Sequence, residues 1–199
     1  PNLTTVNVSG LINAIITNTD ITPFFKQITD DKFAVTGGEL AKLSNQFYLV
    51  GGQRFDGQYN PMGHGTYVQT YTEAIQKFTL NNSGATLSYS GYEKITDPIH
   101  LHRRDYNLLS HIFPDGSEGL VISSGVFQQF VDLPFLYPVE IKEDGYVAKT
   151  EFNQYLNNYH TAHTNIYDSL ENKMTSLFFG GISQYYYVDG ALHQDDFVP

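Results

Sequence analysis

Residues 45 to 57 read NQFYLVGGQRFDG, an aromatic and aliphatic run that ends at a pair of glycines. Similar runs occur twice more, as GLVISSGVF at residues 119 to 127 and TSLFFGGIS at residues 175 to 183. Near-continuous apolarity over so short a run is typical of a strand that is covered on both faces. Glycine after such a strand lets the backbone turn or approach another strand closely. The recurrence therefore predicts one structural unit that is used repeatedly along the chain.

A second element precedes these runs in a fixed order. It reads FKQITDDKF at residues 25 to 33, YEKITDPIH at residues 92 to 100 and, more loosely, FNQYLNNYH at residues 152 to 160. A β-prone segment and a few turn-forming residues lead from this element into each glycine-ended run, which is the pattern of a hairpin. Two further runs follow the glycines in the first two units. The pattern predicts four strands in meander order, after which the unit starts again.

These motifs resemble kelch-type β-propellers of a divergent kind. The resemblance rests on FYLVGG at Phe47 to Gly52, on LFFGG at Leu177 to Gly181, and on HRRDYNLL at His102 to Leu109, where that family often carries an Arg before the first strand. It covers roughly residues 25 to 199. It implies an all-β fold, a kelch-like β-propeller segment built of four-stranded antiparallel meander blades.

The repeats divide a single propeller segment into blade-like units at residues 25–97, 98–157 and 158–199. Residues 1–24 are expected to form the edge of a preceding blade, and LINAIITNTDITPFF at Leu11 to Phe25 fits either an outer strand or a short helix. Propellers close with about four to eight blades. We therefore expect these residues to be a segment of a longer propeller, or a ring that another chain completes.

Composition limits the partners. The chain has 11 basic and 21 acidic residues and a formal net charge of -10, so nucleic acid and anionic membrane surfaces are disfavoured. No apolar stretch approaches the length of a membrane span, which predicts no membrane insertion. The absence of cysteine excludes disulfides and thiolate metal sites within these residues. Abundant Asn, Thr and Tyr with scarce Lys and Arg favour an extracellular, cell-surface or periplasmic bacterial protein, with the cytoplasm as the alternative.

The stretch Gln53 to Tyr71 predicts a long connection that could hold a ligand, because such connections on rigid scaffolds often carry binding residues. Aromatic faces beside charged side chains could stack on a sugar ring or clasp a peptide. The alternative is an insertion that folds back over its own blade and buries Phe55 and Tyr67. Tyr185 to Asp196 is the analogous connection of the last unit. The predicted ligand-binding residues are Arg54, Phe55, Asp56, Tyr59, His64, Tyr67, Tyr186 and Asp189.

Two other constellations suggest chemistry. His100 and His102, together with His160 and His163, could meet near a propeller axis and bind zinc or copper, or could be polar loop residues. A carboxylate pair for glycosidic cleavage could come from Asp56, Glu73, Asp105, Glu140, Asp189, Asp195 and Asp196. We favour the simpler reading, with no catalytic residue, no metal and no cofactor. The expected function is a non-catalytic recognition module that binds a protein or glycan ligand, and the alternatives are a carbohydrate-active propeller enzyme or a structural docking subunit.

Overall fold

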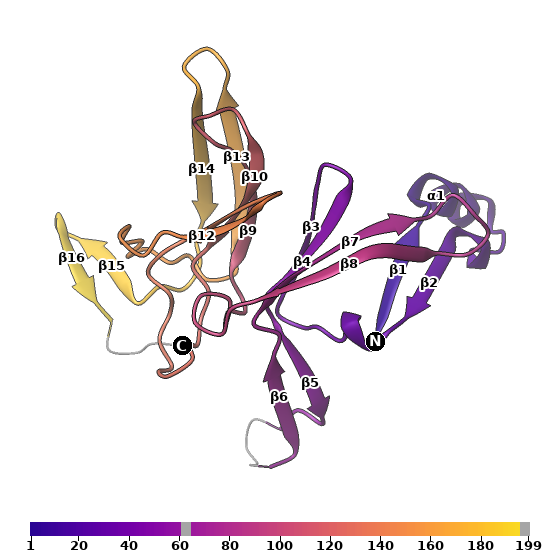
Figure 1. Cartoon of the computed structure of the whole chain (residues 1–199), viewed down its shortest axis with the longest axis horizontal. Helices are drawn as coiled ribbons and strands as arrows, with labels where there is room; N and C mark the ends of the chain where they lie inside the picture. Colours follow the sequence, from indigo (N-terminus) through magenta and orange to yellow (C-terminus); the bar gives the residue numbers. More distant parts are fainter. Residues whose placement is uncertain (61–64, 196–199) are drawn as a thin grey trace.

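The computed structural model describes residues 1–60 and 65–195. Strands dominate this part of the chain, with one α-helix and two short 3₁₀ helices, and all strand pairs in it are antiparallel. Figure 1 shows that these strands form several separate sheets and hairpins rather than one continuous sheet. The predicted all-β class is therefore confirmed.

Two four-stranded meanders form the centre of the molecule, and we call them sheet one and sheet two. In each sheet the spatial order of the strands follows the order of the chain, as the repeated pattern predicts. Sheet one consists of β3 (Glu39–Leu43), β4 (Gln46–Val50), β7 (Ala74–Asn81) and β8 (Ser88–Thr96). Sheet two consists of β9 (Asn107–Ile112), β10 (Glu118–Ser123), β11 (Val139–Lys142) and β12 (Gly145–Ala148).

The remaining strands pair as two-stranded hairpins. They are β1 (Asn2–Val6) with β2 (Phe25–Thr29), β5 (Gln53–Gly57) with β6 (Tyr67–Tyr71), β13 (Ala162–Asp168) with β14 (Lys173–Phe179), and β15 (Tyr185–Val188) with β16 (Ala191–Gln194). The three apolar runs therefore lie in β4, β10 and β14, in three different sheets. The stretch Gln53 to Tyr71 is not the loop that we expected, because most of it forms the β5–β6 hairpin, inserted between β4 and β7.

The first 24 residues contain β1, the helix α1 (Val8–Thr17) and the 3₁₀ helix η1 (Thr22–Phe24); a second 3₁₀ helix, η2 (Asp31–Phe33), follows β2. Of the two alternatives for residues 11–25, the helix is therefore the one found up to Thr17. The Asn7 side chain caps this helix by accepting a hydrogen bond from the Gly10 amide at 3.1 Å. Asn18 ends it in the left-handed conformation that commonly closes helices.

The glycines behind the apolar runs have a shared geometry. Gly52, Gly125 and Gly181 all have positive φ, at 74°, 106° and 100°. The residue after each of them forms an isolated antiparallel bridge to a residue just before the first strand of its own unit. These bridges join Thr36 to Gln53, Arg104 to Val126 and Tyr159 to Ile182. They align the three units residue by residue.

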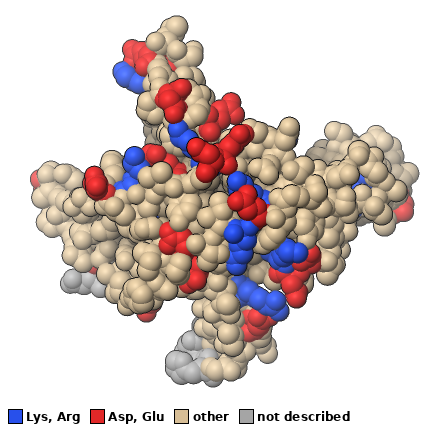
Figure 2. Space-filling view, in the orientation of Figure 1, with Lys and Arg blue, Asp and Glu red and all other residues tan. Residues whose placement is uncertain are grey.

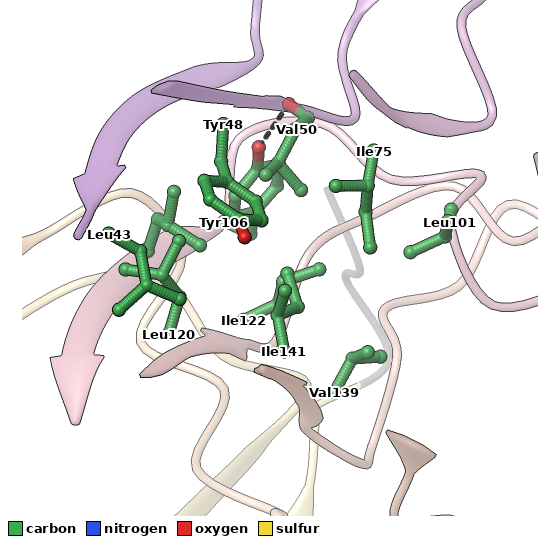
Figure 3. Packing of buried hydrophobic residues seen from close by; sticks show 11 residues of the cluster. Leu43, Tyr48, Val50, Ile75, Leu101, Tyr106, Leu120, Ile122, Val139 and Ile141 are labelled. Atoms are coloured by element: carbon green, nitrogen blue, oxygen red, sulfur yellow. Dashed lines mark hydrogen bonds between the residues drawn. The ribbon is translucent and has the colours of Figure 1, made fainter. Parts of the chain in front are cut away.

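The largest apolar cluster lies between sheet one and sheet two (Figure 3). Tyr48, Val50 and Ile75 of sheet one, each essentially without exposure, face the alternate residues Leu120 and Ile122 of β10. Because side chains alternate across a strand, the in-between residues of β4 and β10 point to the other faces of their sheets. This explains why both runs are apolar throughout.

Tyr106 fastens the two sheets to each other. Its buried hydroxyl donates a hydrogen bond to the Val50 carbonyl, shown as a dashed line in Figure 3, and accepts one from the Glu39 amide at 3.0 Å. Burial raises the pKa of this phenol far above its ordinary value. The hydroxyl therefore stays protonated and holds the ends of β3 and β4 against sheet two.

A carboxylate just after a strand connects neighbouring sheets. Asp97 accepts hydrogen bonds from the Ile99 amide at 2.9 Å, the His100 amide at 3.0 Å and the Tyr146 hydroxyl of β12 at 2.7 Å. Asp30 accepts from the Lys32 amide and the Tyr89 hydroxyl of β8 in the same way. Burial alone would raise the pKa of Asp97, but these hydrogen bonds outweigh it and the pKa is lowered.

This arrangement predicts a pH-dependent effect of Asp97→Asn. A carboxyl with a lowered folded-state pKa stabilises the fold above its unfolded pKa, near 3.9, and loses this contribution as pH falls through the folded value. We expect the variant to lose about 1 to 2 kcal/mol of unfolding free energy at pH 7, and the difference from the native chain to shrink below about pH 4. Urea titrations at pH 7 and pH 3 measure both values. An equal deficit at the two pH values would contradict the assignment.

Candidate ligand-binding site

The β5–β6 hairpin carries an aromatic cluster on one face. Phe55 stacks on Tyr67 with ring centroids 5.0 Å apart, and Tyr59 lies 5.8 Å from Tyr67 and 6.3 Å from Phe55. Phe55 and Tyr67 are diagonal neighbours in the antiparallel pairing, since Gly57 stands directly opposite Tyr67. Phe55 and Tyr67 are half-buried, whereas Tyr59 is 65% exposed. The cluster therefore offers one aromatic ring to solvent on a packed base.

Charged side chains occupy the other face of β5. The Arg54 Nε atom donates to an Asp56 carboxylate oxygen at 2.7 Å, and an Arg54 terminal nitrogen lies 3.9 Å from the Asp31 carboxylate. The hydrogen bond from Arg54 lowers the pKa of Asp56, and the same bond raises the pKa of Arg54. Both side chains are about half exposed. The pair therefore presents donors and an acceptor to solvent in a fixed relation.

An open pocket of about 420 Å³ lies against this strand. Its volume is within the range of small-molecule sites. Phe33, Ala34, Val35 and Phe55 contribute apolar lining, and Arg54 and Asp56 contribute polar lining. The lining residues are Pro1, Asn2, Phe33, Ala34, Val35, Thr36, Arg54, Phe55 and Asp56.

The predicted site residues fall into two groups. Arg54, Phe55, Asp56, Tyr59 and Tyr67 share one hairpin, so the structure brings these five together. The others do not join them, as the following placements show. Tyr186 lies on β15 and stacks on His193 at 5.5 Å, Asp189 is in the turn after β15, and Figure 1 shows this hairpin far from β5–β6. His64 lies outside the described residues.

The histidines considered as metal ligands have separate partners. His100 hydrogen-bonds the Tyr137 hydroxyl at 2.9 Å, and His102 contacts the Glu73 carboxylate at 2.8 Å. His160 lies 3.9 Å from an Asp105 oxygen, and His163 contacts a backbone carbonyl. In the described part of the chain, no group of three or more His, Asp or Glu side chains is placed to hold a metal ion.

Four of the carboxylates considered for catalysis have partners within the protein. Besides Asp56 and Glu73, Asp105 accepts a hydrogen bond from the Tyr159 hydroxyl at 3.0 Å, and Glu140 lies 3.7 Å from the Lys149 amine. Asp196 is outside the described residues. These contacts are typical of structural ion pairs and capping interactions.

Arg103 makes several buried contacts, although the sequence analysis did not assign it to any site. The Arg103 side chain is fully buried and donates to the carbonyls of His100, Ser124 and Tyr137 at 2.8, 2.6 and 2.9 Å. Its guanidinium also stacks on Phe135, 3.9 Å from the ring centroid. Burial lowers the pKa of Arg103 to about 10, so it remains charged at neutral pH. The only signal in the sequence was the Arg pair of HRRDYNLL.

Charged side chains of both signs are mixed on the face of the molecule that Figure 2 draws. Figure 2 shows that Lys and Arg side chains on this face alternate with Asp and Glu and do not form an uninterrupted basic surface. No helix in residues 1–60 and 65–195 has the length and apolarity that crossing a bilayer requires.

No known family model matches the chain, and no curated protein matches its sequence.

Proposed function

We propose that the protein is a non-catalytic recognition module that binds a glycan at the β5–β6 hairpin, on a kelch-like propeller scaffold. The observation that carries this proposal is that one short hairpin presents the exposed ring of Tyr59 on one face and the ion pair of Arg54 and Asp56 on the other. A glycan can place the C–H face of a sugar ring on an aromatic side chain, and its hydroxyls can hydrogen-bond charged groups. A protein ligand at the same surface is the other outcome that the test below separates.

Three features support the scaffold part of the proposal. The four-stranded meander occurs twice in succession, the glycines behind the apolar runs have positive φ in three units, and Asp30 and Asp97 each bond a tyrosine of the following sheet. Gly125 lets the backbone approach the buried Arg103, since a Cβ there would lie 3.1 Å from its side chain. An exported location fits a glycan ligand and the Lys- and Arg-poor composition.

The binding surface predicts a specific effect of Tyr59→Ala. Loss of the exposed ring is expected to weaken binding to a glycan selected on an array by about five- to thirtyfold, because one aromatic contact contributes roughly 1 to 2 kcal/mol. Isothermal titration calorimetry measures the change. Tyr187→Ala is the matched control, since Tyr187 is 64% exposed on β15 and lies outside the site.

Three results would overturn the proposal. Equal affinities of the Tyr59 and Tyr187 variants would place the ligand elsewhere. Release of reducing ends from the retained glycan, abolished by Asp56→Asn, would establish an enzyme instead of a binding module. If the array retains no glycan and pull-downs recover a protein that depends on Tyr59, the hairpin binds a protein.

A further inference from the structure

The β13–β14 pair and the β1–β2 pair each correspond to one half of a four-stranded sheet such as sheet one. The β13–β14 hairpin corresponds to the first two strands of sheet one, because the Tyr159–Ile182 bridge aligns it with the Thr36–Gln53 bridge. The β1–β2 hairpin corresponds to the last two strands. Its pairs Leu3–Ile28 and Asn2–Thr29 match the pairs Ile75–Ile95 and Ala74–Thr96 of sheet one.

Each half has one free edge where the complete sheets are joined. In sheets one and two, the second and third strands pair antiparallel, as β4 with β7 and β10 with β11. Within the described residues, β14 pairs only with β13, and β1 pairs only with β2. An open edge of this kind is a template for another strand. β14 corresponds to β4 and β1 corresponds to β7, so the free edges of β14 and β1 are the edges through which β4 and β7 pair in sheet one.

One face of the β13–β14 hairpin carries exposed apolar side chains at positions whose equivalents in sheet one are buried. Ile166, Leu177 and Phe179 are 55%, 41% and 62% exposed. By the bridge alignment they are equivalent to Leu43, Tyr48 and Val50, which are 5%, 0% and 0% exposed in the cluster against sheet two. In the described part of the chain, the cluster that buries Leu43, Tyr48 and Val50 includes residues of sheet two, and it does not include Ile166, Leu177 or Phe179. This face lacks the neighbour that sheet two provides for sheet one.

Sheet one has a matching uncovered position. Leu40 of β3 is 47% exposed, whereas its equivalent in sheet two, Leu108, is 7% exposed beneath sheet one. A completed sheet in front of sheet one would cover Leu40 as sheet one covers Leu108. The exposed face of β13–β14 and the face of sheet one that carries Leu40 could therefore be buried by packing against each other.

We propose that a second copy of this chain completes the sheet, with β14 of one copy pairing with β1 of the other. Both halves belong to the same chain and share one register. Within one molecule the two hairpins lie apart, with sheet one and sheet two between them (Figure 1). Two copies joined head to tail at both ends make six sheets, within the four to eight that close a ring. The pairing rests on the repeated unit and is independent of the ligand.

The register can be tested by disulfide cross-linking, because the chain has no cysteine of its own. Equivalence with the β4–β7 pairing places Leu177 opposite Thr5 of the second copy, since Tyr48 pairs with Lys77. Directly opposed residues on antiparallel strands have Cα separations that a disulfide can span. The double variant Leu177→Cys with Thr5→Cys is expected to form a covalent dimer under mild oxidation. Leu177→Cys with Thr4→Cys, one residue out of register, is the matched control and should not.

Solution mass provides an independent measurement. Light scattering of the native chain is expected to give twice 22.4 kDa at micromolar concentration. Phe179→Asp should return the mass to 22.4 kDa with an unchanged circular dichroism spectrum, whereas Phe130→Asp, at a position that is 85% exposed elsewhere, should leave the dimer intact.

A monomer at all concentrations, or equal cross-linking of the two cysteine pairs, would overturn the proposal. If Phe179→Asp does not fold, the cysteine pairs still decide the matter, and glycan binding by a folded monomeric variant separates this proposal from the function of the hairpin.

Discussion

Replacing Arg103 by Met is expected to lower the free energy of unfolding by at least about 3 kcal/mol. The buried guanidinium donates to three carbonyls, of His100, Ser124 and Tyr137, and stacks on Phe135. Methionine fills part of the volume but leaves these carbonyls without a donor in a site that water does not reach. The cost is large because unsatisfied buried polar groups lose their hydration without compensation. Guanidinium chloride denaturation, followed by circular dichroism, measures the change.

The control for this prediction is Arg54→Met. Arg54 also makes ion pairs, but its side chain is 45% exposed. Surface ion pairs contribute about 0 to 1 kcal/mol, so this variant should be nearly as stable as the native chain. Arg103→Lys should lie between the two, because an ammonium keeps the charge but does not reproduce the planar set of donors. If Arg103→Met and Arg54→Met are equally stable, Arg103 does not hold the loops of sheet two together.

Gly52→Ala is the second large expected effect, at about 3 kcal/mol or more. A Cβ at Gly52 would lie 2.5 Å from the Gly38 nitrogen and 2.7 Å from the Thr36 oxygen. Both are backbone atoms of the segment that leads into β3, so neither can rotate away. The residue also has a φ of 74°, which an L-residue adopts at a cost. The melting temperature and the urea midpoint should both fall.

Gly91→Ala separates the two causes. Gly91 has a φ of 60° on β8, but a Cβ there would meet nothing within 4 Å. This variant is expected to lose about 1 kcal/mol, the conformational part alone. The difference between the two variants measures the close approach of the segments around Gly52 and Gly38. Equal losses would mean that the backbone around Gly52 moves aside freely.

The predictions that succeeded were those that depend on neighbours along the chain. The apolar runs at residues 47–50 and 120–122 form strands, as their near-continuous apolarity predicts, and the glycines behind them have positive φ. The loop expected at Gln53 to Tyr71 was wrong in its conformation. The Gly and Pro residues of this stretch indicated a loop, whereas its two ends form strands in which Phe55 pairs with Gln69 and Asp56 pairs with Val68.

The candidate site was predictable only in part. Five of its residues are close in sequence and lie on one hairpin, so local reasoning found them. The wall formed by Phe33, Ala34 and Val35 was not predicted, since it comes from a segment that packs against β5 through the fold. Tyr186 and Asp189 were grouped with the hairpin by analogy between units, and analogy of position in a repeat does not bring residues together in space.

The sequence by itself determined the strand content, the repeated four-strand unit and the acidic character of the protein, because periodicity, turn residues and charge are local properties of the chain. Only the tertiary structure decided that Arg103 is buried among three carbonyls while Arg104 beside it is not, and that Phe179 is exposed where its equivalent Val50 is buried. The physical reason is that burial depends on which sheet lies in front of a residue, and residues that carry the same pattern can face either a packed neighbour or solvent.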